Sequence, residues 1–124
     1  MTDRELLELA AKAAEQKWHS YHHMKGLCCR DDSYGGLIEY YWNPLASDGD
    51  ALRLAVKLGI SYEWVNRADY PDPMQWASSP VGLMAGTDDA AKYGWVTTFF
   101  GDDPYAATRR AIVRAAAEIG KGMV

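Results

Sequence analysis

The sequence predicts a mixed α/β (α+β) protein in which three helices pack on an antiparallel or mixed sheet of about 4–5 strands. Three segments repeat apolar residues at helical spacing, and the stretches between them hold short aromatic and β-branched runs typical of strands. The predicted order is αββαββα, which can form an αβα-sandwich-like arrangement or leave one sheet face partly open. A length of 124 residues suits a single domain over residues 1–124.

The first helix is expected over residues 3 to about 16. Thr2 and Glu5, three positions apart, form a capping-box signature in which each side chain accepts a hydrogen bond from the other's backbone N–H. The apolar side chains that line one face of this helix are Leu6, Leu9, Ala10 and Ala13. The charged side chains between them are expected to face water.

Two strands are expected next, at residues 17–24 (KWHSYHHM) and 37–42 (LIEYYW). The second run is aromatic and β-branched, which favours a strand. Residues 28–36 (CCRDDSYGG) are rich in turn-forming residues. We therefore expect the two strands to pair as a hairpin through the segment 31–36.

The middle helix follows a turn at Asn43-Pro44, because proline biases the residue before it away from helical geometry. Ser47 or Asp48 can cap the free N–H groups at its start. Apolar residues at helical spacing predict one buried face: Ala51, Leu54, Ala55 and Leu58. Gly59 stands where a left-handed residue commonly ends a helix.

The second half is expected to hold strands at residues 60–66 (ISYEWVN) and 93–100 (YGWVTTFF), with a short third strand considered at 81–85. Residues 67–80 contain three prolines and no periodicity, which predicts a loop longer than most connections.

The final helix is predicted to start at Asp102-Asp103-Pro104, with aspartate at the cap and proline in the first helical position. It should run to about residue 119 and end at Gly120 and Gly122. Its residues expected to face the sheet are Tyr105, Ala106, Ile112, Ala116 and Ile119.

Composition argues against several classes of protein. The net charge is −4 and Lys and Arg form no run, so sequence-independent nucleic-acid binding is not expected. No apolar run approaches the roughly 20 residues of a membrane span, and the acidic N-terminal stretch is unlike a signal peptide. The adjacent Cys28 and Cys29 indicate a reducing compartment, so we expect the cytoplasm.

Several stretches together resemble a phage family. The opening ELLELAAKAA helix, the strand that ends in WNP, the segment SDGDALRLAVKLG and the closing TRRAIVRAAAEI helix are similar to small phage and prophage proteins grouped as the phage ABA-sandwich domain. Residues 44–48 match its turn before the middle helix, and residues 111–116 match its closing-helix core. The resemblance covers residues 3 to about 120. It implies αβα layering and expression in an infected or lysogenic bacterium, and it transfers no catalytic residue.

A group of metal-like residues lies early in the chain: His19, His22, His23, Cys28 and Cys29. Zinc prefers four converging ligands, whereas adjacent residues on a strand point to opposite sides. We therefore expect strand surface and loop here, with no metal site and no cofactor. A cysteine nucleophile beside a histidine would need a third orienting group, which the spacing does not indicate.

Paired aspartates and a set of arginines also have structural interpretations. The pairs at residues 31–32, 88–89 and 102–103 are expected to form turns and caps. Arg109, Arg110 and Arg114 are expected to form a solvated helix face. An anion-binding patch that adds Arg53 and Lys57 stays open as an alternative.

Aromatic residues are the strongest indication of a binding surface, because the chain has five Trp and eight Tyr but two Phe. Those expected on strands or loops are Trp18, Tyr40, Tyr41, Trp42, Tyr62, Trp64, Trp76, Tyr93 and Trp95. Some must form the core, and the rest can bind a protein, stack on a base or form a dimer. The candidate binding residues are Trp42, Trp64, Trp76, Trp95, Arg109, Arg110 and Arg114.

These observations favour a non-enzymatic phage accessory protein that binds a host or phage protein, as an inhibitor of bacterial anti-phage defence. The sequence contains no GxGxxG, P-loop, GxSxG or HExxH motif. One alternative is a protein that sequesters a nucleotide messenger between aromatic rings and arginines. A metal-dependent enzyme is the least favoured alternative, and homodimerisation stays open.

Overall fold

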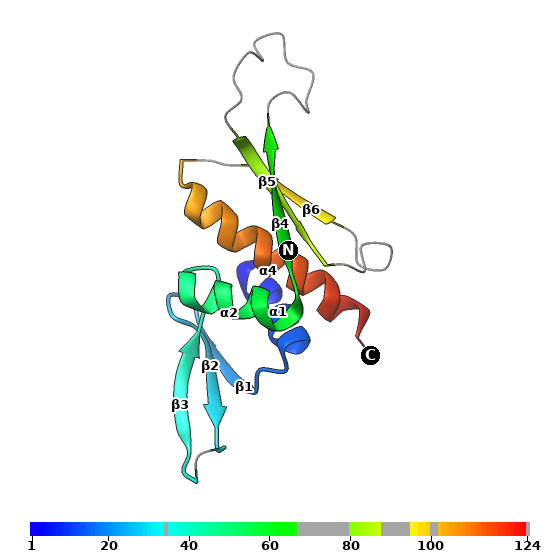
Figure 1. Ribbon diagram of the computed structural model, residues 1–124. Helices are drawn as coiled ribbons and strands as arrows, with labels where there is room; N and C mark the ends of the chain where they lie inside the picture. The colour runs from blue at the N-terminus through cyan, green and yellow to red at the C-terminus, as the bar shows by residue number, and fades with distance from the viewer. Residues whose placement is uncertain (34, 67–79, 88–94, 100–101, 124) are drawn as a thin grey trace.

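The computed structural model describes residues 1–33, 35–66, 80–87, 95–99 and 102–123 (Figure 1). Within these residues the chain is a mixed α+β protein with the following elements: α1 (Asp3–Ala14), β1 (Trp18–His22), β2 (Gly26–Asp31), β3 (Ile38–Trp42), α2 (Asp48–Leu58), β4 (Ser61–Asn66), β5 (Pro80–Gly86), β6 (Trp95–Phe99) and α4 (Pro104–Gly122). The described helices include none long and apolar enough to cross a membrane.

The strands form two separate antiparallel sheets and not the single sheet that the sequence predicts. One sheet has the order β1-β2-β3 and the other the order β4-β5-β6. Figure 1 shows the helices between them, with one sheet at each end of the molecule. The core joins both sheets, because Leu27 and Trp42 of the first and Ala85 of the second belong to one buried cluster with the helices.

The strand β2 corrects the expectation of a turn over residues 28–36. It lies in the middle of the first sheet, so the expected hairpin is a three-stranded meander. Leu27 and Cys29 are fully buried, whereas Cys28 and Arg30 face outward. Gly26 begins the strand at a φ of +92°, and a β-carbon there would lie 2.5 Å from the carbonyl oxygen of Trp42. The glycine is therefore required by close packing of β2 on β3.

The helix α4 is the central element, because it contacts α1, α2 and the second sheet. Alanines let α1 approach it closely: Ala10, Ala11 and Ala14 of α1 and Ala111, Ala116 and Ala117 of α4 are almost completely buried. Gly120 does not end α4 as expected, since the helix continues to Gly122. A β-carbon at Gly120 would collide with the carbonyl oxygen of Leu9, so this glycine is a packing residue.

The predicted helix caps are confirmed. Thr2 and Glu5 form the capping box of α1, and the Ser47 hydroxyl accepts a hydrogen bond from the N–H of Asp50. Gly59 ends α2 at a φ of 66°, and the Asp103 carboxylate caps α4. These bonds satisfy N–H groups that a helix leaves without partners at its start.

Two helix predictions were wrong in detail. The helix α1 ends at Ala14, two residues early, because Glu15 adopts a left-handed conformation with a φ of 58°. Tyr105, expected to face the sheet, is 73% exposed. Tyr105 lies in the first turn of α4, and its ring borders a groove together with residues of α2.

Candidate functional site

The two candidate sites lie on opposite faces of α2. Residues 48, 51, 52 and 55 border a groove shared with β4 and α4, and residues 50, 53, 54 and 57 border a pocket shared with β3 and α1. Since successive helical residues are rotated by about 100°, these two sets point in nearly opposite directions. One short helix thus helps to form two surfaces of different chemistry.

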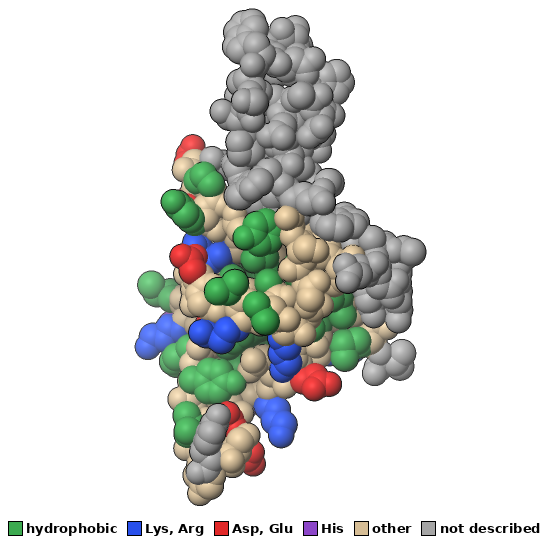
Figure 2. All heavy atoms as spheres, viewed as in Figure 1, with side chains coloured by type: hydrophobic (Ala, Val, Ile, Leu, Met, Phe, Trp, Pro, Cys, Tyr) green, Lys and Arg blue, Asp and Glu red, His purple; other side chains and the backbone are tan. Residues whose placement is uncertain are grey.

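The first surface, the α2–α4 groove, is mainly apolar and has a volume of about 290 Å³. It is lined by Asp48, Ala51, Leu52, Ala55, Tyr62, Tyr105, Thr108, Arg109 and Ile112. Its large apolar side chains remain accessible, because Leu52 is 65% exposed, Tyr62 46% and Tyr105 73%. Figure 2 shows hydrophobic side chains gathered over α2 and the first turns of α4 on this side of the molecule. Such a surface gains free energy when another molecule covers it.

One edge of the groove is polar and ordered. Arg109 donates from its Nε to the carbonyl oxygen of Leu45 at 2.9 Å and from a terminal nitrogen to Asp48 at 2.6 Å. The Arg109 side chain is only 17% exposed, whereas that of Asp48 is 77% exposed. The ion pair therefore holds a water-accessible carboxylate beside the apolar floor.

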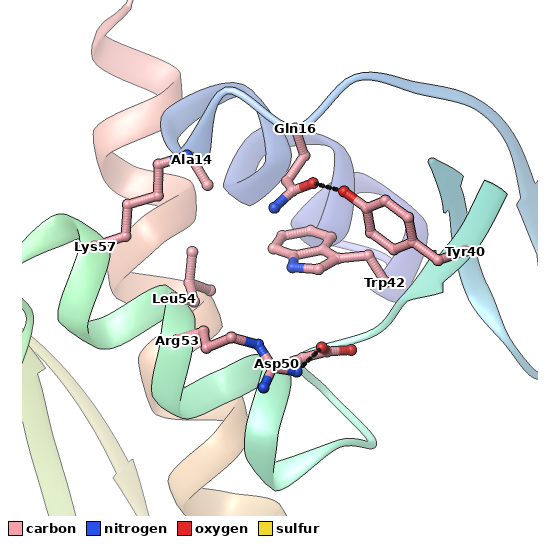
Figure 3. A pocket seen from close by; sticks show the side chains of 8 residues that line it. All are labelled: Ala14, Gln16, Tyr40, Trp42, Asp50, Arg53, Leu54 and Lys57. Carbon is pink, nitrogen blue, oxygen red and sulfur yellow. Dashed lines mark hydrogen bonds and ion pairs between the residues drawn. The ribbon is translucent and has the colours of Figure 1, made fainter. Parts of the chain in front are cut away.

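The second surface, the β3–α2 pocket, has a volume of about 400 Å³ (Figure 3). Its lining residues are Ala14, Gln16, Tyr40, Trp42, Asp50, Arg53, Leu54 and Lys57. In Figure 3 the rings of Tyr40 and Trp42 project from β3, while Arg53, Leu54 and Lys57 project from α2. Two cationic side chains and one carboxylate give this pocket a net charge of +1. It combines flat aromatic surface with positive charge.

Hydrogen bonds hold the walls of the β3–α2 pocket in place. The Tyr40 hydroxyl donates to the side-chain oxygen of Gln16 at 2.7 Å. The Asp50 carboxylate accepts from the backbone N–H of Asn43 at 2.9 Å and pairs with Arg53 at 2.7 Å. Trp42 is only 4% exposed and forms part of the core as well as the pocket wall.

Burial shapes the ionisation of two groups beside this pocket. Desolvation, followed by the neighbouring Cys28 and Asp50, raises the pKa of the Cys29 thiol to about 11. Desolvation also raises the pKa of Tyr40, with smaller contributions from Cys29, Asp31 and Asp50. Cys29 therefore stays a protonated thiol at neutral pH, which argues against its use as a nucleophile.

Of the tryptophans predicted to bind, Trp42 lies in the first sheet and Trp64 and Trp95 lie in the second. Trp42 is buried, so it cannot form the exposed contact surface that the sequence suggested. Trp64 lies in β4 opposite Leu83, and Trp95 lies in β6 opposite Gly86, both in the other sheet. Trp76 falls outside the described residues.

The three arginines of α4 bond to other elements, and Arg109 is largely covered at 17% exposed, whereas the Arg110 side chain stays 42% exposed, as a solvated face requires. Arg109 reaches Leu45 and Asp48 at the groove, Arg110 pairs with Asp3 of α1 at 2.9 Å, and Arg114 donates to Thr98 of β6 at 2.9 Å. Arg53 and Lys57 lie in the β3–α2 pocket, so the five cations form no common anion patch. Helical spacing identified the face of α4 but could not show which neighbours cover it.

The histidine and cysteine group divides into separate roles. His22 Nδ1 accepts hydrogen bonds from the N–H groups of Met24 and Lys25, which stabilises the turn between β1 and β2. His19 and Cys28 instead lie close to Glu39 of β3, with one donor atom from each side chain within 4.8 Å of the others.

The sequence analysis did not identify Glu39, and of the residues that line the α2–α4 groove it named only Arg109 as a candidate binding residue. Leu52, an apolar residue of α2 that is 65% exposed, was the available signal for the groove. Glu39 carried no such local signal, since its neighbours depend on the strand register.

Comparison with known proteins adds no relative: no protein-family model, no curated protein and no solved structure matches this chain. The site must therefore be interpreted from its own geometry.

Proposed function

We propose that this chain is a non-enzymatic accessory protein that binds another protein through the α2–α4 groove. The proposal rests on one observation: Leu52, Tyr62 and Tyr105 stand exposed around a floor of small and apolar side chains. Exposed apolar surface that is contiguous and bordered by polar groups is typical of protein interaction sites. The absence of nucleotide-binding and hydrolase motifs in the sequence supports a role without catalysis.

The partner segment that fits is an amphipathic helix with a basic side chain near its apolar face. A groove of about 290 Å³ accepts two or three apolar side chains, such as those spaced by four residues on a helix. The exposed Asp48 carboxylate offers an acceptor to a Lys or Arg at the edge. The net charge of −4 favours the approach of such a basic partner.

The biological setting in this proposal comes from the resemblance to phage ABA-sandwich proteins. It supports a host or phage protein as the partner, in the cytoplasm of an infected or lysogenic bacterium, and an inhibitor of anti-phage defence as the role. Its test is the identity of the partner recovered from infected cells.

The experiment compares two variants of the same helix. Leu52→Asp changes a residue that lines the groove, and Val56→Asp changes one that is 74% exposed but lies outside the lining. Wild type and Val56→Asp should recover the same stoichiometric protein from infected-host lysate, and Leu52→Asp should weaken purified-partner binding by at least about tenfold. Hydrogen exchange should slow over α2 and the start of α4 in the complex.

Equal binding by the two variants would contradict the proposed site. A dimer mass in light scattering that Leu52→Asp reduces to a monomer mass would assign the groove to a second copy of the chain. That result would contradict a heterologous partner.

A second candidate function is sequestration of a nucleotide-type ligand in the β3–α2 pocket. The specific support is that the ring of Tyr40, which is 37% exposed, shares this pocket with Arg53 and Lys57. A base can stack on an aromatic ring while cationic side chains bind phosphate. Cyclic or adenylated nucleotides should raise the melting temperature of wild type, and Lys57→Ala should reduce the shift. A flat screen with such ligands would reject this function.

A further inference from the structure

We propose that His19, Cys28 and Glu39 form a binding site for one zinc-type divalent cation on the outer face of the β1–β2–β3 sheet. One donor atom from each side chain lies within 4.8 Å of the other two. The donors would be an imidazole nitrogen, a thiolate sulfur and a carboxylate oxygen, all of which zinc binds in proteins. None of the three residues lines the groove or the pocket, so the site does not depend on the proposed function.

The strand order brings these residues together. Cys28 lies in the central strand β2, paired with Ser20 of β1 on one side and Tyr41 of β3 on the other. Glu39 is two residues from Tyr41 and therefore lies on the same outward face of the sheet. The β1–β2 register shifts between Trp18 and Ser20, which places His19 at the irregularity. Such irregularities change the direction in which a side chain points, and here they act on the imidazole of His19.

The distances suit ligands of a single ion after small side-chain rotations. His19 Nε2 lies 3.7 Å from Glu39 Oε1. Ligands at tetrahedral angles and usual zinc distances are separated by about 3.3–3.6 Å. His19 and Glu39 have exposed side chains, so rotations can close the remaining gap without moving the strands.

The donor chemistry selects the class of cation. Magnesium and calcium prefer all-oxygen sites, whereas the mixed sulfur, nitrogen and oxygen set favours zinc and similar transition metals. A thiolate and a carboxylate also offset the two positive charges of the ion. Three protein ligands leave one coordination position for water or for a donor from another molecule.

A Cys–His–Glu catalytic relay is the competing interpretation. Such a relay runs in a line, with the base oriented by its own hydrogen-bonded partner. Here the three donor atoms converge on one another, and the cluster lies on a sheet surface instead of in the β3–α2 pocket. Convergence is the arrangement that an ion requires.

Arg30 competes with the ion for Glu39. Its Nε lies 3.3 Å from Glu39 Oε1, and its side chain is 53% exposed. The arginine must move away or share the carboxylate when the cation binds. Removing it should therefore tighten binding if Glu39 is a ligand.

The test uses the full chain, reduced and stripped with chelator, and titrates it with Zn²⁺ by calorimetry and with Co²⁺ by absorption. We expect one ion per chain, a thiolate-to-cobalt charge-transfer band, and strong visible bands typical of tetrahedral Co²⁺.

Variants assign the ligands. Cys28→Ser and Glu39→Gln should each weaken zinc binding by at least about tenfold, and Cys28→Ser should abolish the charge-transfer band. Arg30→Ala should tighten binding. His23→Gln is the matched control, since His23 is exposed but outside the cluster, and it should bind as wild type does. Circular dichroism of the metal-free variants checks that each remains folded.

Three results would overturn the proposal: no saturable binding by wild type, a charge-transfer band that survives Cys28→Ser, or equal loss with His23→Gln. Cys29 cannot substitute for Cys28 without unfolding, because it is fully buried and its Sγ donates to the carbonyl oxygen of Leu27 at 3.7 Å.

Discussion

The two faces of α2 differ in how their side chains are held. In the β3–α2 pocket, Tyr40 is bonded to Gln16, and Asp50 binds both Asn43 and Arg53. In the α2–α4 groove the surface is mainly apolar, and Arg109 and Asp48 form an ordered polar edge. The pocket thus ties Tyr40, Asp50 and Arg53 into hydrogen bonds and contributes Trp42 to the core, while the groove leaves apolar area that a partner can cover. An amphipathic helix can serve stability on one side and recognition on the other.

The largest expected change in stability comes from a substitution in the wall of the β3–α2 pocket. Trp42→Ala should lower the free energy of unfolding by about 3–5 kcal/mol, because a side chain only 4% exposed leaves a cavity. Leu52→Ala on the groove side, 65% exposed, should change it by less than about 0.5 kcal/mol. Urea unfolding followed by circular dichroism measures both. Similar losses in the two variants would contradict the distinction between the faces.

A second test compares one arginine on each face. Arg109→Ala should cost about 1–3 kcal/mol, because it leaves the part-buried Leu45 carbonyl without this donor. Arg53→Ala removes an ion pair from a side chain that is 74% exposed and should cost at most about 1 kcal/mol. Thermal and urea unfolding of both variants give the comparison. A larger loss of unfolding free energy in Arg53→Ala than in Arg109→Ala would show that the polar edge of the groove contributes less to stability than the ion pair in the pocket.

Alkaline pH should lower the free energy of unfolding, because two groups beside the β3–α2 pocket have raised pKa values. The folded pKa of Cys29 is about 11, compared with its ordinary value of 9.0, so the folded chain keeps a proton that the unfolded chain has released. The contribution of the protonated Cys29 thiol to stability is fully present below about pH 9 and is lost as the pH rises toward 11. The raised pKa of Tyr40 acts in the same direction. Urea midpoints across this range should fall.

The control for this pH dependence replaces each cysteine separately. Cys29→Ala should flatten the alkaline fall of the midpoint, and Cys28→Ala should retain most of it. An unchanged slope in Cys29→Ala would exclude the buried thiol as the cause.

The smallest expected effect concerns the Tyr40 hydroxyl. Tyr40→Phe removes its bond to Gln16, which is accessible to water, so the loss should be about 0.5 kcal/mol. The ring remains, and any nucleotide binding that depends on stacking should persist. Ligand-induced melting shifts of Tyr40→Phe and Tyr40→Ala would separate the hydroxyl from the ring. A loss above 2 kcal/mol, on the scale of a core deletion, would contradict this account.

Several elements were predictable because their signals are local. Thr2 with Glu5, Ser47, Gly59 and Asp103 act within a few residues of themselves, and each cap is present. The strand β2 was missed because its inward face has only Leu27 and Cys29, beside a run of turn-forming residues. Its strand character comes from pairing on both sides, which no short window contains.

The candidate sites were less predictable than the fold. Helical spacing placed Arg109 on the outward side of α4, yet the structure covers it with α2 and the Leu45 carbonyl. Trp42 was expected at a binding surface because indole rings suit interfaces, but its position next to β2 buries it. Exposure depends on which elements pack together, so aromatic content alone could not identify the groove.

The amino-acid sequence alone determined where the helices start, where α2 ends and which of their faces are apolar, because capping and periodicity act over one or two turns. Only the tertiary structure decided the division into two sheets, the close contact of Gly120 with Leu9, and the meeting of His19, Cys28 and Glu39. These features depend on strand register and helix approach between residues distant in the chain. The free energy that selects them comes from burial and pairing across the whole fold, which no local pattern records.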